Sequence, residues 1–356
     1  MPVLVVNAGS SSLKLSVLDD EDSVLHAVNE PLSSGDDPAP LLSRFLSSVA
    51  ERPDIAGHRV VHGGSRFIQP VMIDASVLST LDELASLAPL HNPPAIAGIT
   101  ALKRVAPDLP AVACFDTAFH ASLSPAAYTY AVPRNWNVRR YGFHGLSHRY
   151  ASRRAASLLG VPVESVSLVT CHLGAGASLC AVRQGESVDT TMGFTPLEGL
   201  VMATRSGTVD PGAVLSVQQR LGLSAAAAED VLNHQSGMLA LAGTADMRQV
   251  VAHHGLALDV YVHRLRKEVA GMVAAMDGID GLVFTGGVGE ASPVVRQLAA
   301  DGLDFLGIAV DPDRNAAVAD HDVEISADGA SVRSVVVHAR EDIEIATAAR
   351  RLRQRS

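Results

Sequence analysis

The sequence has no long apolar run, few cysteines and few aromatic residues. None of its apolar stretches approaches the ~20 residues that a membrane-spanning helix needs. The N-terminus also has no basic segment in front of an apolar one, which is how a signal peptide begins. We therefore expect a soluble, cytoplasmic protein without a membrane partner.

The cysteines are too few for a disulfide framework. The 356 residues include 3 of them, Cys114, Cys171 and Cys180, and the first two lie within apolar stretches. Their spacing matches no zinc motif, and their odd number does not suit paired disulfides. Buried thiols in a reducing cytosol explain these positions better.

Positive charge is also sparse. The chain has 28 Lys and Arg against 38 Asp and Glu, which gives a formal net charge of −10. Because the sequence contains no basic block, it is a poor candidate for binding nucleic acid or an anionic membrane.

Strand-like and helix-like segments alternate along the chain, which indicates an α/β fold. The length suggests two or three domains. Segment 255–277 has a broad apolar face typical of a core or dimer helix, and residues 29–40 form a polar, proline-rich surface connection. The expected strands are 3–7, 13–18, 58–61, 111–115, 166–172, 178–183, 282–285 and 334–338. The expected helices are 38–50, 76–88, 95–105, 145–160, 211–221, 255–277 and 341–353.

The first hairpin is the most informative local feature. An apolar strand ends near Val6 and returns as a second strand from Leu13, with a turn of small residues between them. Gly9 removes side-chain bulk, and N–H groups exposed in such a turn favour anions. Ser10 and Ser12 add hydroxyl groups, so phosphate is one natural ligand. A tight Ser/Gly hairpin that binds nothing explains the same residues equally well.

A second hairpin repeats this pattern. Residues 166–183 again read as a strand, a turn of small residues and a strand, about half the chain length after residues 3–18. Two domains of similar construction, each offering a turn to one ligand, would explain the repeat. Chance similarity of two hairpins is the alternative, because the shared identities are few.

Other polar or glycine-rich clusters lie at expected element ends, at 57–64, 89–94, 115–120, 139–148, 199–211 and 284–290. In their order and over nearly the whole chain, these motifs resemble the acetate, propionate and butyrate kinase family. That family belongs to the superfamily of actin, hexokinase and the heat-shock ATPases.

The resemblance implies a fold. It predicts an α/β protein of two ribonuclease-H-like domains, each with a βββαβαβα core, flanking a nucleotide-binding cleft. An N-terminal acyl and phosphate domain is expected at 1–150, with the C-terminal helix 343–356 packing back on it. A nucleotide-binding domain is expected at 151–342. The resemblance also implies a homodimer.

The resemblance further implies reversible transfer of a phosphoryl group from ATP to acetate by direct in-line attack, giving acetyl phosphate and ADP. Arg59 and Arg205 match arginines that hold the acyl carboxylate and the transition state, a role that suits a planar guanidinium. His91 and His144 match histidines that donate hydrogen bonds to the phosphoryl group. Asp116 matches an aspartate beside the acetate site. It could orient an arginine or substrate, complete a metal site, or merely pair with an arginine.

The implied cofactor is Mg²⁺ or Mn²⁺, and Asn7 and Glu341 match the family's metal positions. Asp342 stays a neighbouring candidate because segment 339–342 departs from the family's usual Thr-x-Glu-Glu. The implied ATP/ADP contacts are Lys14, Ser10, Ser12, His172, Leu173, Gly174, Ala175, Gly176, Asp246, Met247, Arg248, Gly286, Gly287, Val288 and Gly289.

The acyl pocket implied by the resemblance comprises Arg59, Val61, Leu90, Phe143 and Pro196. Its apolar members are not reduced to Gly or Ala. A pocket sized for a methyl group disfavours one more methylene by ~1–3 kcal/mol. We therefore expect acetate as substrate, with propionate reacting more slowly.

A position in the second hairpin also departs from the family. Ala175 stands where most members have Asn, so its side chain cannot donate a hydrogen bond to phosphate, although its backbone N–H remains. A weakly active or non-catalytic nucleotide-binding protein on the same fold therefore stays open as an alternative. A propionate or butyrate kinase is a separate alternative within the same class of enzyme. The presence of Arg59, His91, His144 and Arg205 argues against a non-catalytic protein.

Overall fold

The computed structural model describes residues 1–9, 12–33, 35–89 and 91–355. By its contacts the chain divides into two compact units. The first comprises Met1–Ala121, Phe143–Tyr150 and Arg340–Ser356, and the second comprises Ser122–Gly142 and Ala151–Ala339. These units differ from the predicted domains, since 122–142 groups with the second unit and 340–342 with the first.

The first unit is built on a six-stranded sheet with the order β3-β2-β1-β4-β6-β5. The strands are β1 (Val3–Ala8), β2 (Ser12–Leu18), β3 (Val24–Pro31), β4 (Ile55–Val60), β5 (Val71–Met72) and β6 (Ala111–Phe115). β1, β2 and β3 are antiparallel neighbours, β4 runs parallel to both β1 and β6, and β5 is antiparallel to β6. The carboxyl ends of β1, β4 and β6 therefore share one edge, where open α/β sheets bind ligands.

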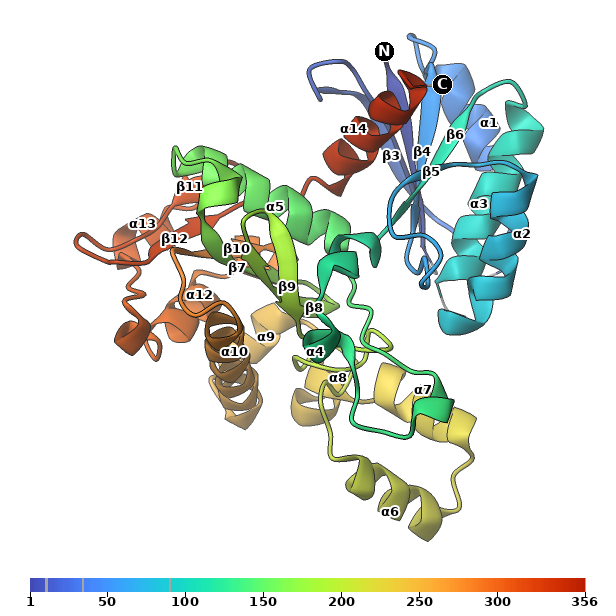
Figure 1. The fold of residues 1–356 in the computed structure, drawn as a ribbon. Helices are drawn as coiled ribbons and strands as arrows, with labels where there is room; N and C mark the ends of the chain where they lie inside the picture. Colours follow the sequence, from blue (N-terminus) through green and yellow to red (C-terminus); the bar gives the residue numbers. More distant parts are fainter. Residues whose placement is uncertain (10–11, 34, 90, 356) are drawn as a thin grey trace. The chain divides into compact units, whose positions relative to one another are not determined.

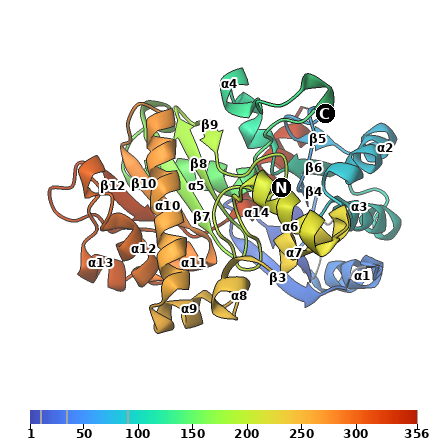
Figure 2. The ribbon, with the colours of Figure 1, turned by 90° about the horizontal axis from the view of Figure 1, so that it is seen from below.

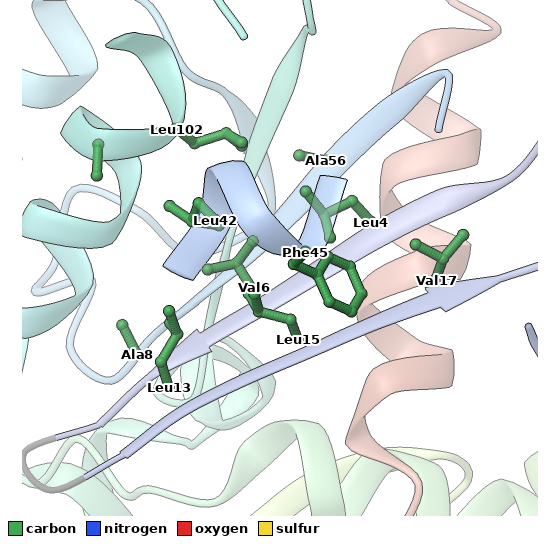
Figure 3. Close-up of a cluster of buried hydrophobic side chains, with 11 residues drawn as sticks. Leu4, Val6, Ala8, Leu13, Leu15, Val17, Leu42, Phe45, Ala56 and Leu102 are labelled. Atoms are coloured by element: carbon green, nitrogen blue, oxygen red, sulfur yellow. The ribbon is translucent and has the colours of Figure 1, made fainter. Parts of the chain in front are cut away.

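Helices cover both faces of this sheet (Figure 1). The helices of this unit are α1 (Ala39–Ser48), α2 (Ala75–Leu84), η1 (Ala85–Leu87), α3 (Asn92–Val105), η2 (Ala118–Ser122) and α14 (Glu341–Arg353), together with the first residues of α5 (Gly145–Leu158), which continues into the second unit. Successive side chains of β1 point to opposite faces of the sheet, as in any strand. Leu4 and Val6 pack with Leu42 and Phe45 of α1 (Figure 3).

The opposite face is covered by the C-terminal helix. Val3 and Val5 of β1 pack against Ile345 and neighbouring residues of α14. The helix approaches β4 so closely that a Cβ on Gly57 would lie 2.3 Å from Cγ2 of Ile345. This contact fixes the start of α14, and with it Glu341, at the carboxyl edge of the sheet.

The second unit repeats the same topology. Its six-stranded sheet has the order β11-β12-β10-β7-β8-β9. The strands are β7 (Ser167–Leu173), β8 (Ala177–Arg183), β9 (Glu186–Thr190), β10 (Gly281–Thr285), β11 (Val323–Glu324) and β12 (Arg333–Val336). In the order β9-β8-β7-β10-β12-β11, neighbouring strands have the same antiparallel and parallel pairings as in the first sheet's order β3-β2-β1-β4-β6-β5. The chain is thus an α/β protein of two similar domains, and the repeated hairpin belongs to a repeated topology.

The second unit carries more helices than the first. They are α4 (Pro125–Tyr128), η3 (Arg134–Trp136), η4 (Val163–Ser165), α6 (Pro211–Leu221), α7 (Ala225–His234), α8 (Gly237–Ala242), α9 (Met247–His253), α10 (Leu256–Ala275), α11 (Gly286–Ala291), α12 (Pro293–Ala300), η5 (Asp304–Leu306) and α13 (Pro312–Ala316). The long helix α10 contacts β7, β8 and β9 (Figure 2). Its apolar residues, including Leu258, Leu265 and Val269, are buried within the chain. Its apolar face therefore belongs to the core, and the homodimer stays a prediction.

The expected strands and helices are all observed, and the differences have local causes. Residues 24–31 form β3 instead of starting a surface connection at 29, because this strand lacks a buried face and so has no apolar alternation. The expected turn at Gly286 is the start of α11. Helix α12 begins with Ser292 capping Val295 and Pro293 in the first turn, a recognisable start signal. No helix of the described ranges is long and apolar enough to cross a membrane.

Candidate active site

An ion pair lies at the carboxyl ends of β4 and β6. The Arg59 side chain is 20% exposed and that of Asp116 is 1% exposed. Nε of Arg59 donates to Oδ1 and Oδ2 of Asp116 at 3.1 and 3.2 Å, and Nη2 donates to Oδ2 at 2.6 Å. The Asp116 carboxylate therefore fixes the plane of the guanidinium, a contact that both the orienting role and simple pairing with an arginine predict.

A second carboxylate lies on the other side of this arginine. Oε2 of Glu341 is 3.8 Å from Nε of Arg59. Burial alone would lower the pKa of Arg59, but Asp116 and Glu341 outweigh it and raise that pKa. Burial raises the pKa of Asp116, and the guanidinium works against that rise. Arg59 thus stays a cation with two carboxylates beside it.

The structure separates Glu341 from its neighbour Asp342. The Asp342 carboxylate accepts bonds of 2.9–3.1 Å from Nε and Nη2 of Arg340, which also donates to the carbonyl of Asp22. Glu341 faces Arg59 at the strand ends. Of the two candidates, Glu341 is therefore the one beside the predicted acyl site.

Asn7 and Lys14 lie at the same edge. They are cross-strand partners in the β1–β2 pair. Val6 of β1 pairs with His58 of β4, so the next residues along the two strands, Asn7 and Arg59, lie beside each other. Asn7 shares the face of Val3 and Val5, which α14 covers, because side chains alternate along a strand. Ser12 begins β2, and its carbonyl accepts from Gly9 N–H at 2.9 Å to close the turn. The predicted contacts Ser10 and Leu90 lie outside the described residues.

The residues present fit a hard divalent cation. The amide oxygen of Asn7 and the carboxylates of Glu341 and Asp116 are the oxygen donors that Mg²⁺ prefers. Within the described residues, no group of three or more His, Cys, Asp or Glu side chains could hold a metal. A Mg²⁺ ion here would therefore complete its shell with water and phosphate oxygens, as it commonly does.

Other predicted acyl-site residues are tied to this edge by hydrogen bonds. Val61 follows β4, and the next residue, His62, exchanges two bonds with the Asn92 side chain, at 3.1 and 3.0 Å. Asn92 directly follows His91, so the β4 exit and the start of α3 are joined. The His62 ring meets the Phe143 ring edge-on at 5.5 Å between centroids. These contacts bring Val61, His91 and Phe143 into one region of the first unit.

Two buried polar residues that were not predicted as site residues also organise this region. Asn92 is fully buried, and the hydroxyl of buried Thr117 accepts from Gly63 N–H at 3.0 Å. Both lie inside motifs noted in the sequence. The only signal for them in the sequence is that each is a polar residue inside a motif with predicted ligand-binding neighbours. This signal does not show which chain segment the residue will contact.

A cavity of about 590 Å³ lies within the second unit. It is lined by many of the predicted nucleotide residues, namely Gly174, Ala175, Asp246, Met247, Arg248, Gly287 and Val288. The other lining residues are mostly apolar and were not predicted: Ala203, Met238, Ala245, Val251, Tyr261, Ala291, Ser292, Pro293 and Val294. His172, Leu173, Gly176, Gly286 and Gly289 are not among the lining residues, and their nucleotide contacts stay predictions.

Tight backbone turns shape this cavity. Gly174 N–H donates to the carbonyl of Gly176 at 3.0 Å, which closes the turn of the second hairpin. Gly286 has φ +78, and a Cβ there would lie 2.9 Å from the carbonyl oxygen of Leu173. Glu290 accepts the Gly286 N–H at 2.8 Å. Helix α11 therefore starts directly against the end of β7.

The predicted ATP/ADP contacts Asp246, Met247 and Arg248 lie at the start of a helix. The Asp246 carboxylate caps α9 by accepting Arg248 N–H at 2.9 Å, and it also accepts from Nη2 of Arg248 at 2.8 Å. The Arg248 side chain is 91% exposed, which places it at the rim of the cavity.

Arg205 and Pro196 meet in the loop that follows β9. Nη1 of Arg205 donates to the carbonyl of Pro196 at 3.3 Å. Burial lowers the pKa of Arg205. No ion pair involves Arg205 among the described residues, so most of its donors remain available to an anion.

Comparison with known proteins decides the family. A model of the Acetokinase family matches residues 42–347. The chain belongs to this family. An acetate kinase from Leifsonia xyli subsp. xyli is 44% identical over 384 residues, covering 97% of each chain. The acetate kinase of Porphyromonas gingivalis superposes with a TM-score of 0.90 at 34% identity, covering 98% of this chain and 99% of the other.

The Acetokinase family match makes this chain a kinase that phosphorylates a carboxylate with ATP. A propionate kinase from Francisella tularensis superposes equally well, with a TM-score of 0.90 at 35% identity over 98% of this chain and 99% of the other. The likeness of fold therefore does not distinguish acetate from propionate as the substrate.

Proposed function

We propose that this chain is an acetate kinase that transfers the γ-phosphoryl group of Mg-ATP reversibly to acetate. The observation that carries the proposal is a guanidinium at the strand ends, fixed by Asp116, with Val61 two residues further along the chain and Phe143 packed against the next residue, His62. A small carboxylate has a charged end and an apolar end, which matches this combination. Propionate is the expected slower substrate.

The proposed mechanism needs no general base. Acetate is already ionised at neutral pH, so its oxygen can attack the γ-phosphorus directly. Arg59 orients the carboxylate, while Arg205 offsets charge on the phosphoryl oxygens. His91 and His144 donate hydrogen bonds to the same oxygens. Catalysis then consists of positioning and charge stabilisation, as expected for phosphoryl transfer.

The metal and the nucleotide have separate candidate sites. Asn7 and Glu341 would hold Mg²⁺, which would neutralise charge on the phosphate oxygens. The cavity lined by Gly174, Asp246 and Gly287 would hold the nucleoside part of ATP. Glycines there let a ligand lie against the backbone. We also propose, from the family alone, that the enzyme is a cytoplasmic homodimer.

A weakly active nucleotide-binding protein is the second candidate, and Ala175 is the observation that favours it. This side chain is exposed and lines the cavity. An alanine there supplies only its backbone N–H, so we expect weaker phosphate handling than with an amide side chain. The remaining charged groups argue that activity persists.

The deciding experiment measures acyl phosphate formation by hydroxamate trapping with Mg-ATP and acetate, propionate or butyrate. We expect kcat/KM to fall from acetate to propionate by about 10–100-fold, and to fall further for butyrate. Ala175→Asn should raise activity without changing this order. Arg44→Ala alters an exposed arginine paired with Glu30 and controls for the effects of preparing a variant protein, so it should keep wild-type activity. Absence of acyl phosphate with all three acids at millimolar concentration would refute the proposed function.

A further inference from the structure

A three-residue strap, residues 143–145, carries both Phe143 and His144 and lies against the loop that follows β6. The N–H of Gly145 donates to the carbonyl of Asp116 at 2.9 Å. Nε2 of His120 lies 3.0 Å from the carbonyl oxygen of Phe143. Because a carbonyl can only accept, Nε2 of His120 must carry the hydrogen. One loop therefore holds the strap on both sides of His144.

The strap needs holding because His144 has an uncommon backbone conformation. Its φ is +57, in the left-handed region that residues with side chains rarely adopt. Such a conformation persists only where the surroundings enforce it, and it is frequent at functional sites. Here the two hydrogen bonds act on the peptide groups immediately before and after His144.

The position of the strap is also set by close packing. A Cβ on Gly145 would lie 2.1 Å from the carbonyl oxygen of Asp116. Phe143, Asp116 and His120 are each 1% exposed. The His120 ring also lies 5.8 Å from the ring of fully buried His148, one turn along α5. The donor to the Phe143 carbonyl is thus itself fixed in place.

We propose that His120 is a positioning residue for this kinase. Its Nε2–H holds the Phe143 carbonyl, and this sets the direction of the His144 imidazole and of the Phe143 ring. The same loop fixes Arg59 through the Asp116 carboxylate, so one segment aligns the carboxylate-binding and phosphoryl-binding groups. His120 acts through these residues and touches neither acetate nor phosphate. This inference rests on the functions proposed above for His144 and Phe143.

The test compares two amide substitutions at His120. The amide nitrogen of His120→Gln can occupy the place of Nε2, whereas that of the shorter His120→Asn cannot. We expect His120→Asn to lower kcat by about 10–100-fold, the effect of misplacing a reacting group by about 1 Å. KM for ATP should stay within about twofold, since the nucleotide cavity is built from other residues. His120→Gln should recover most of the lost kcat.

The matched control is His58→Asn, a substitution of another buried histidine of the first unit. Nε2 of His58 has no hydrogen-bond partner among the described residues, so its loss should leave kcat within about twofold of wild type. A purely structural effect of replacing a buried histidine would lower the melting temperature of both Asn variants without this difference in kcat.

Hydrogen–deuterium exchange of the peptide containing Gly145 provides a readout that does not depend on activity. Exchange should be faster in His120→Asn and return towards wild type in His120→Gln. Wild-type protein that forms no acyl phosphate would overturn the proposed function, while the exchange result would still test the strap. Unchanged exchange in His120→Asn, or equal kcat in His120→Asn and wild type, would overturn the role of His120.

Discussion

Two arginines of this enzyme have opposite surroundings. Arg59 is held by Asp116 and faces Glu341, so its charge is largely balanced before any substrate binds. Arg205 has only the Pro196 carbonyl as a side-chain partner in the described part of the chain. A balanced, fixed guanidinium suits orientation of a carboxylate. An unbalanced one suits stabilisation of charge that develops during transfer.

We expect Arg205→Ala to lower kcat by about 10³-fold, within the range reported for removing an arginine that stabilises a phosphoryl transition state. The fold should persist, because only one side-chain hydrogen bond is lost. Steady-state kinetics and a thermal melt measure both effects. Arg220→Ala, an exposed arginine on α6, is the control and should behave as wild type. Wild-type kcat in Arg205→Ala would contradict the assigned role.

At the scale of elements, the carboxyl ends of parallel strands gather the chemistry. Asn7, Arg59 and Asp116 come from the ends of β1, β4 and β6, and Glu341 comes from the start of α14. The strands were predictable because their apolar runs and the turns after them are local signals. Helix α11 was not predicted as a helix, because its glycines resemble a turn and its position depends on contact with β7.

Gly286→Ala tests that contact. The left-handed φ of Gly286 and the nearby Leu173 carbonyl leave no relaxed place for a Cβ. We expect a loss of about 1–3 kcal/mol in the free energy of unfolding and a higher KM for ATP, measured by urea denaturation and kinetics. Gly271→Ala in α10 is the control, since its Cβ would meet open space. That variant should gain about 0.5–1 kcal/mol. Equal stability of the two variants would contradict the strained contact.

At the scale of the whole molecule, buried neutral histidines link folding to pH. Burial lowers the pKa of His58 to about 3 and that of His62 to about 4. In the unfolded chain both titrate near 6.5. The unfolded state therefore binds more protons below that pH, and stability falls as pH drops from about 6.5 towards the folded-state pKa values.

Each of these histidines should lower the free energy of unfolding by about 2 kcal/mol when the pH falls from 7 to 5. His58→Leu should remove the contribution of His58 to this loss, so the free energy of unfolding of the variant should fall less than that of wild type over the same interval. Urea denaturation at both pH values measures the difference. An unchanged pH dependence in His58→Leu would contradict a lowered pKa of His58 in the folded state.

The sequence alone determined the class of fold, the repeated hairpin and the motifs that resemble the family, because periodicity and turn residues act over short stretches of chain. The tertiary structure decided what depends on partners far apart in sequence. It separated Glu341 from Asp342, since Arg340 occupies the latter. It also turned the apolar face of α10 inward and brought His120 to the carbonyl of Phe143. Such pairings follow from how sheets and helices pack, which no local pattern specifies.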